Sequence, residues 1–218
     1  MIPYFIKTPN IIPFLFKNQI WNFSTEEKVI YLTFDDGPTT KVTPWVLDTL
    51  QAYNAKATFF CIGKNIENHP EIYQRIHREN HGIGNHTYSH FNGWKTNTPE
   101  YLDSVLKTEE LIERFSKGKQ NGNTLKLFRP PYGKISLAQI KELTSHHYKV
   151  IMWSVLSGDF DIKISPKKCF YNVIKHSDNG SIIVFHDSQK AFGKLHVVLP
   201  KILDYFTEKG YVFRKISL

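Results

Sequence analysis

Short apolar runs rich in β-branched and aromatic residues recur along the chain, separated by longer stretches with helical periodicity. Each run ends at a polar or turn-forming residue, which is typical of strands buried in a parallel sheet. About seven such runs are present, at residues 29–34, 57–61, 81–85, 125–128, 150–153, 181–185 and 211–213. The pattern therefore predicts a sheet of about seven strands.

Between these runs, apolar side chains repeat every three or four residues. Val42, Val46 and Leu50 share one helical face, and residues 102–112 and 195–206 carry similar stripes. Alternation of strands and helices predicts a parallel sheet, and no glycine fingerprint of the dinucleotide-binding type follows a strand. We therefore expect an α/β fold, a closed or distorted (β/α) barrel rather than a doubly wound open sheet.

We expect one domain, residues 28–218, with residues 1–27 packing on it as an N-terminal segment. The chain has 218 residues, enough for a sizeable core, and 41% hydrophobic residues argue against disorder. Residues 1–7 lack a basic leader, and the apolar stretch 11–16 is short and broken by Pro13. The sequence thus predicts no signal peptide and no membrane span, with a cytoplasmic location as the default.

The formal net charge is +8, but the lysines and arginines are scattered singly or in pairs. A nucleic-acid-binding protein would show a basic run or stripe, so nucleic acid is not an expected partner. The charge indicates a mildly basic, solvated surface, with affinity for anionic polymers as the alternative. The two cysteines, Cys61 and Cys169, are too few for a disulfide scaffold, and nothing in the pattern specifies an oligomeric state.

The first predicted strand ends in two adjacent carboxylates, Asp35 and Asp36, within TFDDGP at residues 33–38. Active sites of barrels lie at the carboxyl ends of the strands. Neighbouring side chains on an extended segment point in different directions, so one carboxylate can bind a metal while the other faces a substrate. Asp-Gly-Pro also occurs in ordinary turns, so this segment alone does not decide between the two.

Two histidines four residues apart, His86 and His90, follow another predicted strand in the segment HTYSH. At this spacing they share one face of a helical turn and can bind one cation. A carboxylate from residues 35–36 completes an Asp-His-His set that leaves positions open for water and substrate, as a catalytic metal site requires. The adjacent pair His146 and His147 suits a surface better than a site.

Three more predicted strand ends carry polar groups. RPPYG, which begins at Arg129, has a backbone fixed by two prolines, suited to aiming a guanidinium at a carboxylate and an N–H at a developing oxyanion. Residues 153–161 and 182–187 also end in ionisable groups. A lone histidine at a strand end is more often structural, but five such strand ends together indicate an active site.

These five segments, in this order, resemble the polysaccharide deacetylase (NodB homology) family, carbohydrate esterase family four, from about residue 28 to the C-terminus. TFDDGP, HTYSH and RPPYG match the first three motifs of that family at every working position. The resemblance implies a TIM-like, distorted (β/α)7 barrel, in agreement with the strand count. It also implies a hydrolase that removes N-acetyl groups from N-acetylglucosamine polymers, such as peptidoglycan glycan or chitin-like oligomers.

The resemblance implies Asp36, His86 and His90 as the ligands of one divalent metal ion. Two imidazoles and a carboxylate suit zinc, cobalt, nickel and manganese alike, and zinc is the first expectation. The implied partner is a carbohydrate polymer or oligosaccharide as substrate.

Proton-transfer roles are also implied by the resemblance. Asp35 corresponds to the general base, and Arg129 to the residue that restrains it. The backbone N–H of Tyr132 corresponds to an oxyanion donor. His186 corresponds to the general acid, and Asp159 to the carboxylate that tunes it.

The chain departs from the family pattern at three positions. Leu156 stands where an aspartate is common, Phe160 replaces a tryptophan, and Phe185 replaces a smaller aliphatic residue. We expect these changes to affect substrate preference, with Phe185 reshaping the pocket for the acetyl methyl group. Asp161 is the nearest carboxylate that could take the place of the missing one.

Other functions fit parts of the pattern. An O-acetyl esterase of xylan-like polymers and an amidohydrolase of small cyclic amides would use related barrels. A carbohydrate-binding homologue without catalysis would usually have lost a ligand or the base, and this chain keeps all of them. Trp94, Tyr132 and Phe160 favour stacking on sugars, although a packed core explains aromatic residues equally well.

Overall fold

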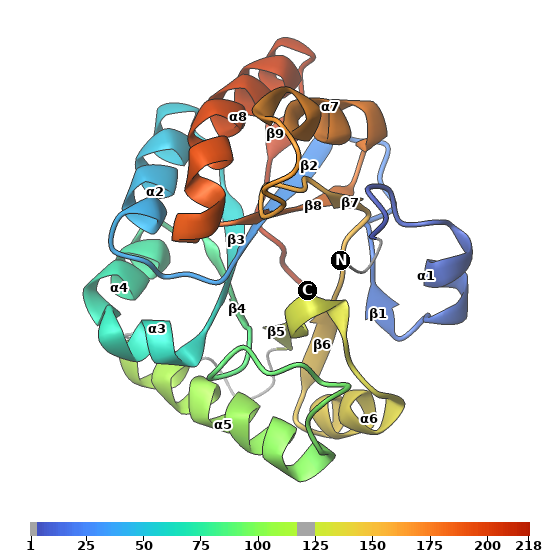
Figure 1. The fold of residues 1–218 in the computed structure, drawn as a ribbon, viewed down its shortest axis with the longest axis vertical. Coiled ribbons are helices and arrows are strands. Elements are labelled where there is room, and N and C mark those ends of the chain that lie inside the picture. Colours follow the sequence, from blue (N-terminus) through green and yellow to red (C-terminus); the bar gives the residue numbers. More distant parts are fainter. Residues whose placement is uncertain (1–3, 117–124) are drawn as a thin grey trace.

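The computed structural model describes residues 4–116 and 125–218, and it confirms the predicted barrel (Figure 1). Its strands form one parallel sheet with a further strand, β9 (Val212–Phe213), paired with β2. The order across the sheet is β1 (Gln19–Ile20), β6 (Tyr148–Ile151), β5 (Lys126–Phe128), β4 (Gly82–Asn85), β3 (Ala57–Cys61), β2 (Val29–Asp35), β8 (Ser181–His186) and β7 (Val155–Leu156).

Helices surround this curved sheet, as Figure 1 shows. They are α1 (Ile11–Leu15), α2 (Val42–Ala52), α3 (Gly63–Asn68), α4 (Pro70–Arg78), α5 (Thr98–Phe115), α6 (Leu137–Ser145), α7 (Pro166–His176) and α8 (Gln189–Glu208), with a short 3-10 turn, η1 (Pro131–Gly133). Of these described helices, none combines the length and the apolar character needed to cross a membrane.

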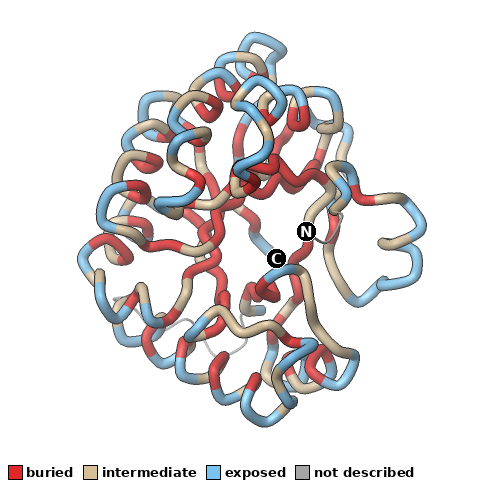
Figure 2. The backbone as a smooth tube through the Cα atoms, in the orientation of Figure 1, coloured by how far each residue is buried: buried red, intermediate tan, exposed pale blue. Residues whose placement is uncertain are grey.

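The core lies between the sheet and its helices. Alternate side chains of each strand point into it. Leu32 and Phe34 of β2 belong to the largest apolar cluster, which also contains Leu47 of α2 and Leu199 of α8. Buried segments follow the strands in Figure 2, while the outer faces of the helices are exposed. Since successive side chains of a strand point to opposite faces, this packing directs Asp35 of β2 toward the barrel interior.

Each predicted apolar run forms a strand, but β1 and β7 were not predicted. The segment before β2 contains β1, which pairs with β6, and its first residues run beside β7. The N–H of Leu156 donates to the carbonyl of Ile6 at 2.8 Å, that of Thr8 to Ser154 at 2.9 Å, and that of Met152 to Ile20 at 2.7 Å. Both strands therefore exist through contacts between distant parts of the sequence.

Candidate active site

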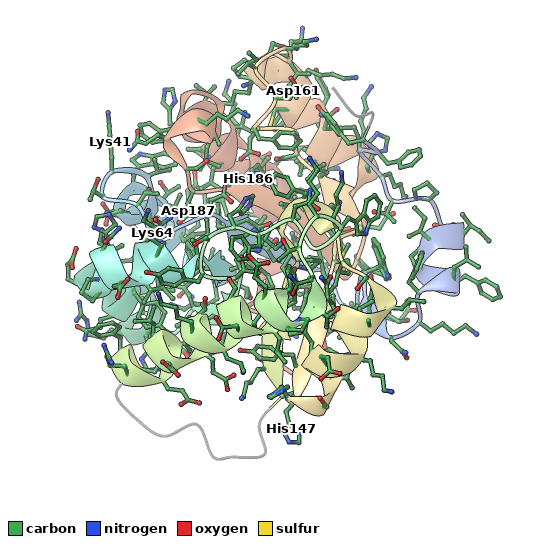
Figure 3. The ribbon with its side chains drawn as sticks, turned by 60° about the horizontal axis from the view of Figure 1, so that its bottom comes forward. Lys41, Lys64, His147, Asp161, His186 and Asp187 are labelled. Atoms are coloured by element: carbon green, nitrogen blue, oxygen red, sulfur yellow. The ribbon has the colours of Figure 1, made fainter. Side chains whose placement is uncertain are left out.

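The five polar segments meet at one end of the barrel. β2 ends at Asp35, β4 at Asn85 and β8 at His186, and all the paired strands of the sheet run parallel. Asp35 and His186 are direct partners in the register of β2 and β8. The predicted convergence of these strand ends is therefore observed. Figure 3 shows His186 and Asp187 near the middle of the molecule and His147, which is exposed, at its edge.

Asp36, His86 and His90 bring three potential metal-binding atoms within 4.8 Å of one another. The Oδ1 atom of Asp36 lies 3.3 Å from Nε2 of His90 and 3.9 Å from Nε2 of His86. This oxygen is buried and makes no hydrogen bond. A buried acceptor without a donor is costly, so the arrangement fits a cation between the three side chains.

The surroundings of His86 and Asp36 favour the protonation states that bind a metal ion, a neutral imidazole and an ionised carboxylate. Burial lowers the pKa of His86 to about 4, and its Nδ1 donates to the carbonyl of Arg129 at 2.7 Å, which leaves Nε2 with a free lone pair. Burial would raise the pKa of Asp36, but the contact with His90 and the neighbouring imidazoles lower it below its usual range. A neutral imidazole and an ionised carboxylate are what a divalent ion requires.

The three potential ligands lie on segments whose backbone is in an unfavourable, left-handed conformation at several residues. Asp36 has φ +83°, Thr87 +61° and His90 +57°, a region that residues other than glycine rarely adopt. The amide of Asn65 donates to the carbonyl of Asp36 at 2.6 Å. The segment from His86 to His90 is not helical, so the expected helical turn is wrong although the two rings do converge. Strain of this kind, held by surrounding contacts, is concentrated at functional sites.

Asp35 forms a buried ion pair with Arg129. Nη1 of Arg129 lies 2.8 Å from Oδ1 of Asp35 and 2.6 Å from the hydroxyl of Thr33. The same guanidinium donates to the carbonyls of Ile151 at 3.2 Å and Met152 at 2.9 Å. Arg129 is fully buried, so nearly all its donors are used within the protein. The pair holds the Asp35 carboxylate in one orientation.

His186 is paired with Asp159 at the end of β8. Nδ1 of His186 lies 2.8 Å from one carboxylate oxygen, and the backbone N–H of His186 donates to the other at 2.8 Å. Asp159 is fully buried. Burial alone would lower the pKa of His186, but the Asp159 charge and hydrogen bond, with Asp36 and Asp35 nearby, raise it to about 10. This imidazole therefore carries a proton at neutral pH.

Tyr132 of the RPPYG segment contacts His90. Its φ is +61°, and its side chain is 62% exposed. Its ring meets that of His90 edge to face, with centroids 4.5 Å apart. The following residue, Gly133, has φ +66°, and a Cβ there would lie 2.7 Å from the ring of Trp153. This glycine allows the backbone of Tyr132 to turn tightly at the mouth of the barrel.

Sequence reasoning did not identify a role for Asp187, which holds the TFDDGP turn. This buried carboxylate accepts hydrogen bonds from the N–H of Gly37 at 2.9 Å and from the hydroxyl of Thr43 at 2.5 Å. Its own N–H donates to the carbonyl of Asp35 at 3.1 Å. Burial raises the pKa of Asp187 to about 7. Its position next to His186 at a strand end was the only signal in the sequence.

Of the three residues that depart from the family pattern, Phe160 contacts the candidate site, whereas Leu156 and Phe185 are buried in strands. The ring of Phe160 lies against the imidazole of His186, with centroids 5.2 Å apart, and Leu156 is buried in β7. Phe185 packs against Phe34 in the cluster that faces the helices. The expectation that Phe185 reshapes an acetyl pocket is therefore wrong, because its side chain points away from the barrel interior.

Asp161 does not take the place of the carboxylate that Leu156 replaces, because its oxygens are used elsewhere. One of its oxygens accepts from the hydroxyl of Tyr4 at 2.8 Å, and the other accepts from the N–H of Lys163 at 2.9 Å. The ring of Tyr4 also lies 5.2 Å from that of Phe160. Asp161 thus ties the N-terminal segment to the rim of the site.

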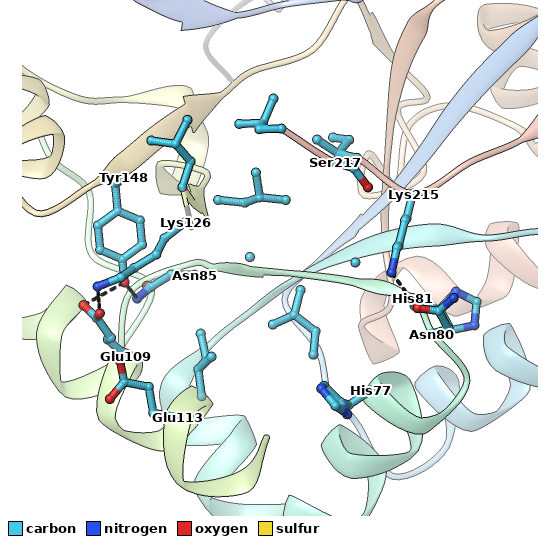
Figure 4. A pocket seen from close by; sticks show the side chains of 18 residues that line it. His77, Asn80, His81, Asn85, Glu109, Glu113, Lys126, Tyr148, Lys215 and Ser217 are labelled. Atoms are coloured by element: carbon cyan, nitrogen blue, oxygen red, sulfur yellow. Dashed lines mark hydrogen bonds and ion pairs between the residues drawn. The ribbon is translucent and has the colours of Figure 1, made fainter. Parts of the chain in front are cut away.

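A separate cavity of about 340 Å³ lies at the amino-terminal ends of β4, β5 and β6 (Figure 4). Its polar groups are largely paired with one another. Lys126 forms an ion pair with Glu109, and the hydroxyl of Tyr148 donates to Glu109 at 3.2 Å and accepts from the amide of Asn85 at 3.0 Å. This cavity is at the other end of the strands from the candidate active site.

Comparison with known proteins places the chain in a family. A family model described as polysaccharide deacetylase matches residues 23–151, more than half of the chain. A peptidoglycan-N-acetylglucosamine deacetylase of Bacillus cereus is 40% identical over 185 residues, which cover 84% of this chain and 65% of that protein. The chain belongs to the polysaccharide deacetylase family, as its motifs predicted.

A second deacetylase of the same name from Bacillus cereus is 32% identical, with 90% of each chain covered. This chain spans less than two thirds of the length of the first relative but nearly the whole of the second. Among solved structures, a peptidoglycan N-acetylglucosamine deacetylase in complex with an N-oxidanyl-benzamide has a TM-score of 0.85, 36% identity and 94% coverage of both chains.

A second solved structure is the esterase family four domain of a multidomain xylanase from the hindgut metagenome of Trinervitermes trinervoides. It has a TM-score of 0.78 and 30% identity, with 88% of each chain covered. The same fold therefore occurs both in peptidoglycan deacetylases and in a domain attached to a xylan-degrading enzyme.

Proposed function

We propose that this chain hydrolyses N-acetyl groups of N-acetylglucosamine units in a glycan, either peptidoglycan or a chitin-like oligomer, with residues 28–218 as the catalytic domain. The proposal rests mainly on one observation: the buried Oδ1 of Asp36 has no hydrogen-bond donor and lies beside two imidazole nitrogens. Acidic and basic groups suited to proton transfer flank this set. The relatives named as peptidoglycan-N-acetylglucosamine deacetylases support the same substrate.

In this proposal Asp36, His86 and His90 hold one divalent ion, with zinc as the first candidate and cobalt, nickel or manganese as alternatives. When bound, the ion would supply Lewis acidity toward the acetyl carbonyl and would lower the pKa of a water toward about 7. A set of three protein donors of this kind is typical of catalytic rather than structural metal sites. The neutral state of His86, favoured by burial, suits this role.

Asp35 acts as the general base and takes a proton from the attacking water. Arg129 keeps one carboxylate oxygen of Asp35 fixed, which leaves the other oxygen available to accept this proton. Attack on the carbonyl carbon forms a tetrahedral oxyanion on the substrate. The backbone N–H of Tyr132 donates to this oxyanion, a contribution of the kind that is typically worth about 3 to 4 kcal/mol of barrier.

His186 acts as the general acid and donates a proton to the leaving amine. Asp159 keeps the imidazole protonated and correctly oriented through the 2.8 Å contact at Nδ1, which leaves Nε2 to carry the transferable proton. A base and an acid of this kind contribute about 10² to 10⁴ each to the rate. Asp35 and His186 are paired positions on the neighbouring strands β2 and β8, so both can reach one bound acetamide group.

An O-acetyl esterase of xylan-like polymers is the second candidate, and it is favoured by the similarity to the xylanase domain. The test uses the protein loaded with zinc and assays acetate released from acetylated chitooligosaccharides, peptidoglycan glycan and acetylxylan. Acetate from the N-acetylated glycans is expected. Acetate from acetylxylan alone would support the esterase, and no acetate from any substrate, with ion occupancy confirmed, would support a non-catalytic homologue.

A further inference from the structure

The loop that follows His90 is held rigidly against the neighbouring loop of the barrel mouth. The amide of Gln139 in α6 donates to the carbonyls of Gly93 at 2.9 Å and Thr96 at 3.1 Å. The side chain of Asn92 accepts from the N–H of Trp94 at 3.1 Å. A Cβ at Gly93 would lie 2.5 Å from the carbonyl oxygen of Lys134, so only glycine allows this approach. The loop therefore has one fixed position.

Trp94 projects from this loop and is 68% exposed. Its indole N–H donates to the carbonyl of Ile135 at 3.2 Å, and Nζ of Lys134 lies 5.0 Å from the ring centroid. The polar atom of the indole is thus already satisfied by the protein. What the ring offers to solvent is apolar surface in a fixed orientation, a feature more typical of a binding surface than of a solvated exterior.

The exposed indole is held by the segment that follows Tyr132 and therefore lies near the candidate active site. Tyr132, the other strongly exposed aromatic residue of this rim, contacts His90 with centroids 4.5 Å apart. Ile135, whose carbonyl accepts from the indole N–H, lies three positions after Tyr132, so their Cα atoms are at most about 11 Å apart. A glycan of a few sugar units whose reacting acetyl group lies at His90 can therefore reach Trp94.

We propose that Trp94 forms a second sugar-binding subsite, where its ring stacks on the apolar face of a pyranose unit beside the one that is deacetylated. The inference rests on the proposed function, because it assumes that the occupant is the same N-acetylglucosamine chain. A rigid aromatic ring binds a sugar face with little loss of conformational entropy, since its rotamer is fixed before binding. The subsite selects oligomers over single sugars and makes turnover dependent on chain length.

The test compares kcat/KM of the zinc-loaded protein for the N-acetylglucosamine dimer and hexamer. We expect the wild type to prefer the hexamer, and Trp94→Ala to reduce the hexamer-to-dimer ratio roughly threefold to tenfold, the range of an aromatic contact. Trp94→Phe should restore most of the ratio. The matched control is Phe14→Ala, because Phe14 is 63% exposed and also lies beneath a lysine, Lys17, at 4.9 Å; its ratio should equal that of the wild type.

A binding measurement separates failure of the subsite from failure of the proposed function. Hexamer affinity is measured by isothermal titration in the Asp35→Asn background, with and without Trp94→Ala. Weaker binding in the double variant supports the subsite, even if the wild type releases no acetate and the proposed function fails. Equal hexamer affinities, or an unchanged hexamer-to-dimer ratio in an active enzyme, would overturn the subsite while leaving the deacetylase proposal intact.

Discussion

The candidate site has two halves: a proposed proton-transfer half, formed by the Asp35–Arg129 and His186–Asp159 pairs, and a proposed ligand half, formed by Asp36, His86 and His90. They differ in how completely the polar groups are paired within the protein. In the proton-transfer half, Asp35 faces Arg129 and His186 faces Asp159, each pair at 2.8 Å. In the ligand half, the Oδ1 of Asp36 has no donor at hydrogen-bonding geometry. The charges of the first half are paired within the chain, whereas the second half brings a carboxylate oxygen and two imidazole nitrogens together, an arrangement that fits a bound cation.

The backbone shows the same difference. Asp35 and His186 lie at the ends of regular strands, where the ladder of hydrogen bonds fixes them. Asp36 and His90 have left-handed backbone conformations, at φ +83° and +57°, and depend on side chains such as Asn65 for support. We infer that the proton-transfer half contributes to the stability of the fold, while the ligand half is costly until an ion is bound.

The largest effect is expected from Asp36→Ala compared with Asp35→Asn. Both substitutions should lower kcat by at least about 10³-fold, with Asp36→Ala the more severe at about 10⁴-fold or more, because it removes the Lewis acid as well as the activated water. Only Asp36→Ala should lose the ion. The measurements are acetate release and ion content by mass spectrometry of the purified variants.

Chelation of the wild type provides the control for this pair. Removing the ion should lower Tm of the wild type and of Asp35→Asn, because a ligand that binds only the folded state stabilises it. Asp36→Ala should show no change in Tm on chelation. Full ion occupancy in Asp36→Ala would contradict the assignment of the ligand half.

The proton-transfer half is best tested by Arg129→Met. This change leaves the buried Asp35 carboxylate without its partner, and breaking a buried pair from one side costs about 3 to 5 kcal/mol of the free energy of unfolding. Urea denaturation measures the loss. Asp35→Asn in the same chain should recover part of it, because the uncompensated charge is removed.

Arg75→Met is the matched control for Arg129→Met. Arg75 also forms ion pairs, at 2.6 Å to both Asp48 and Glu79, but its side chain is 27% exposed. Solvent screening limits such pairs to about 1 kcal/mol or less. If Arg129→Met and Arg75→Met lowered the free energy of unfolding equally, the inference that the buried Asp35–Arg129 pair contributes specially to the stability of the fold would be contradicted.

A smaller effect on rate, about 10²-fold, is expected from Asp159→Asn. Without the charge and hydrogen bond of Asp159, burial is opposed only by the charges of Asp36 and Asp35, so the pKa of His186 falls and the imidazole holds its proton less well at neutral pH. In the wild type the pKa is raised from 6.5 to about 10. The stabilisation from this proton is fully present below pH 6.5 and is lost as pH rises through about 10, and Asp159→Asn should abolish that dependence.

Rate profiles and urea denaturation at several pH values measure both effects of Asp159→Asn. The matched control is Asp161→Asn, since Asp161 binds Tyr4 and Lys163 and not His186. Its alkaline limit of activity should equal that of the wild type. An Asp159→Asn enzyme that retained the wild-type alkaline limit would argue against His186 as the acid.

The fold was largely predictable because its strands are short apolar runs with clear ends. β1 and β7 were missed, since two residues carry no periodicity and both strands form only against distant segments. The strand ends at Asp35 and His186 were predicted to converge for a simple reason: parallel strands place their carboxyl ends at one edge.

The supporting contacts of the site could not be predicted in the same way. Asn65 carries no motif, and Thr33 and Asp187 have no role that their neighbours in the sequence indicate. Their roles depend on which backbone or guanidinium atom each reaches in space. The left-handed conformation of His90 likewise replaced the helical turn expected from the spacing of the histidines. Local sequence thus indicated which groups meet at the candidate site, and tertiary contacts specified how they are held.

Asn65→Ala should give the smallest effect and the sharpest separation of the two halves. Asn65 holds the carbonyl of Asp36 at 2.6 Å but does not contact the ion site with its own donor atoms. Loss of such support typically lowers metal affinity about 10- to 100-fold, measured here by competition with a chelating dye. Asn68→Ala, an exposed position on the same helix, should retain the affinity of the wild type.

At saturating zinc the rate of Asn65→Ala should approach that of the wild type, because Asp35 and Arg129 are undisturbed. A rate that stayed low at full zinc occupancy would mean that the two halves are coupled through the Asp36 backbone.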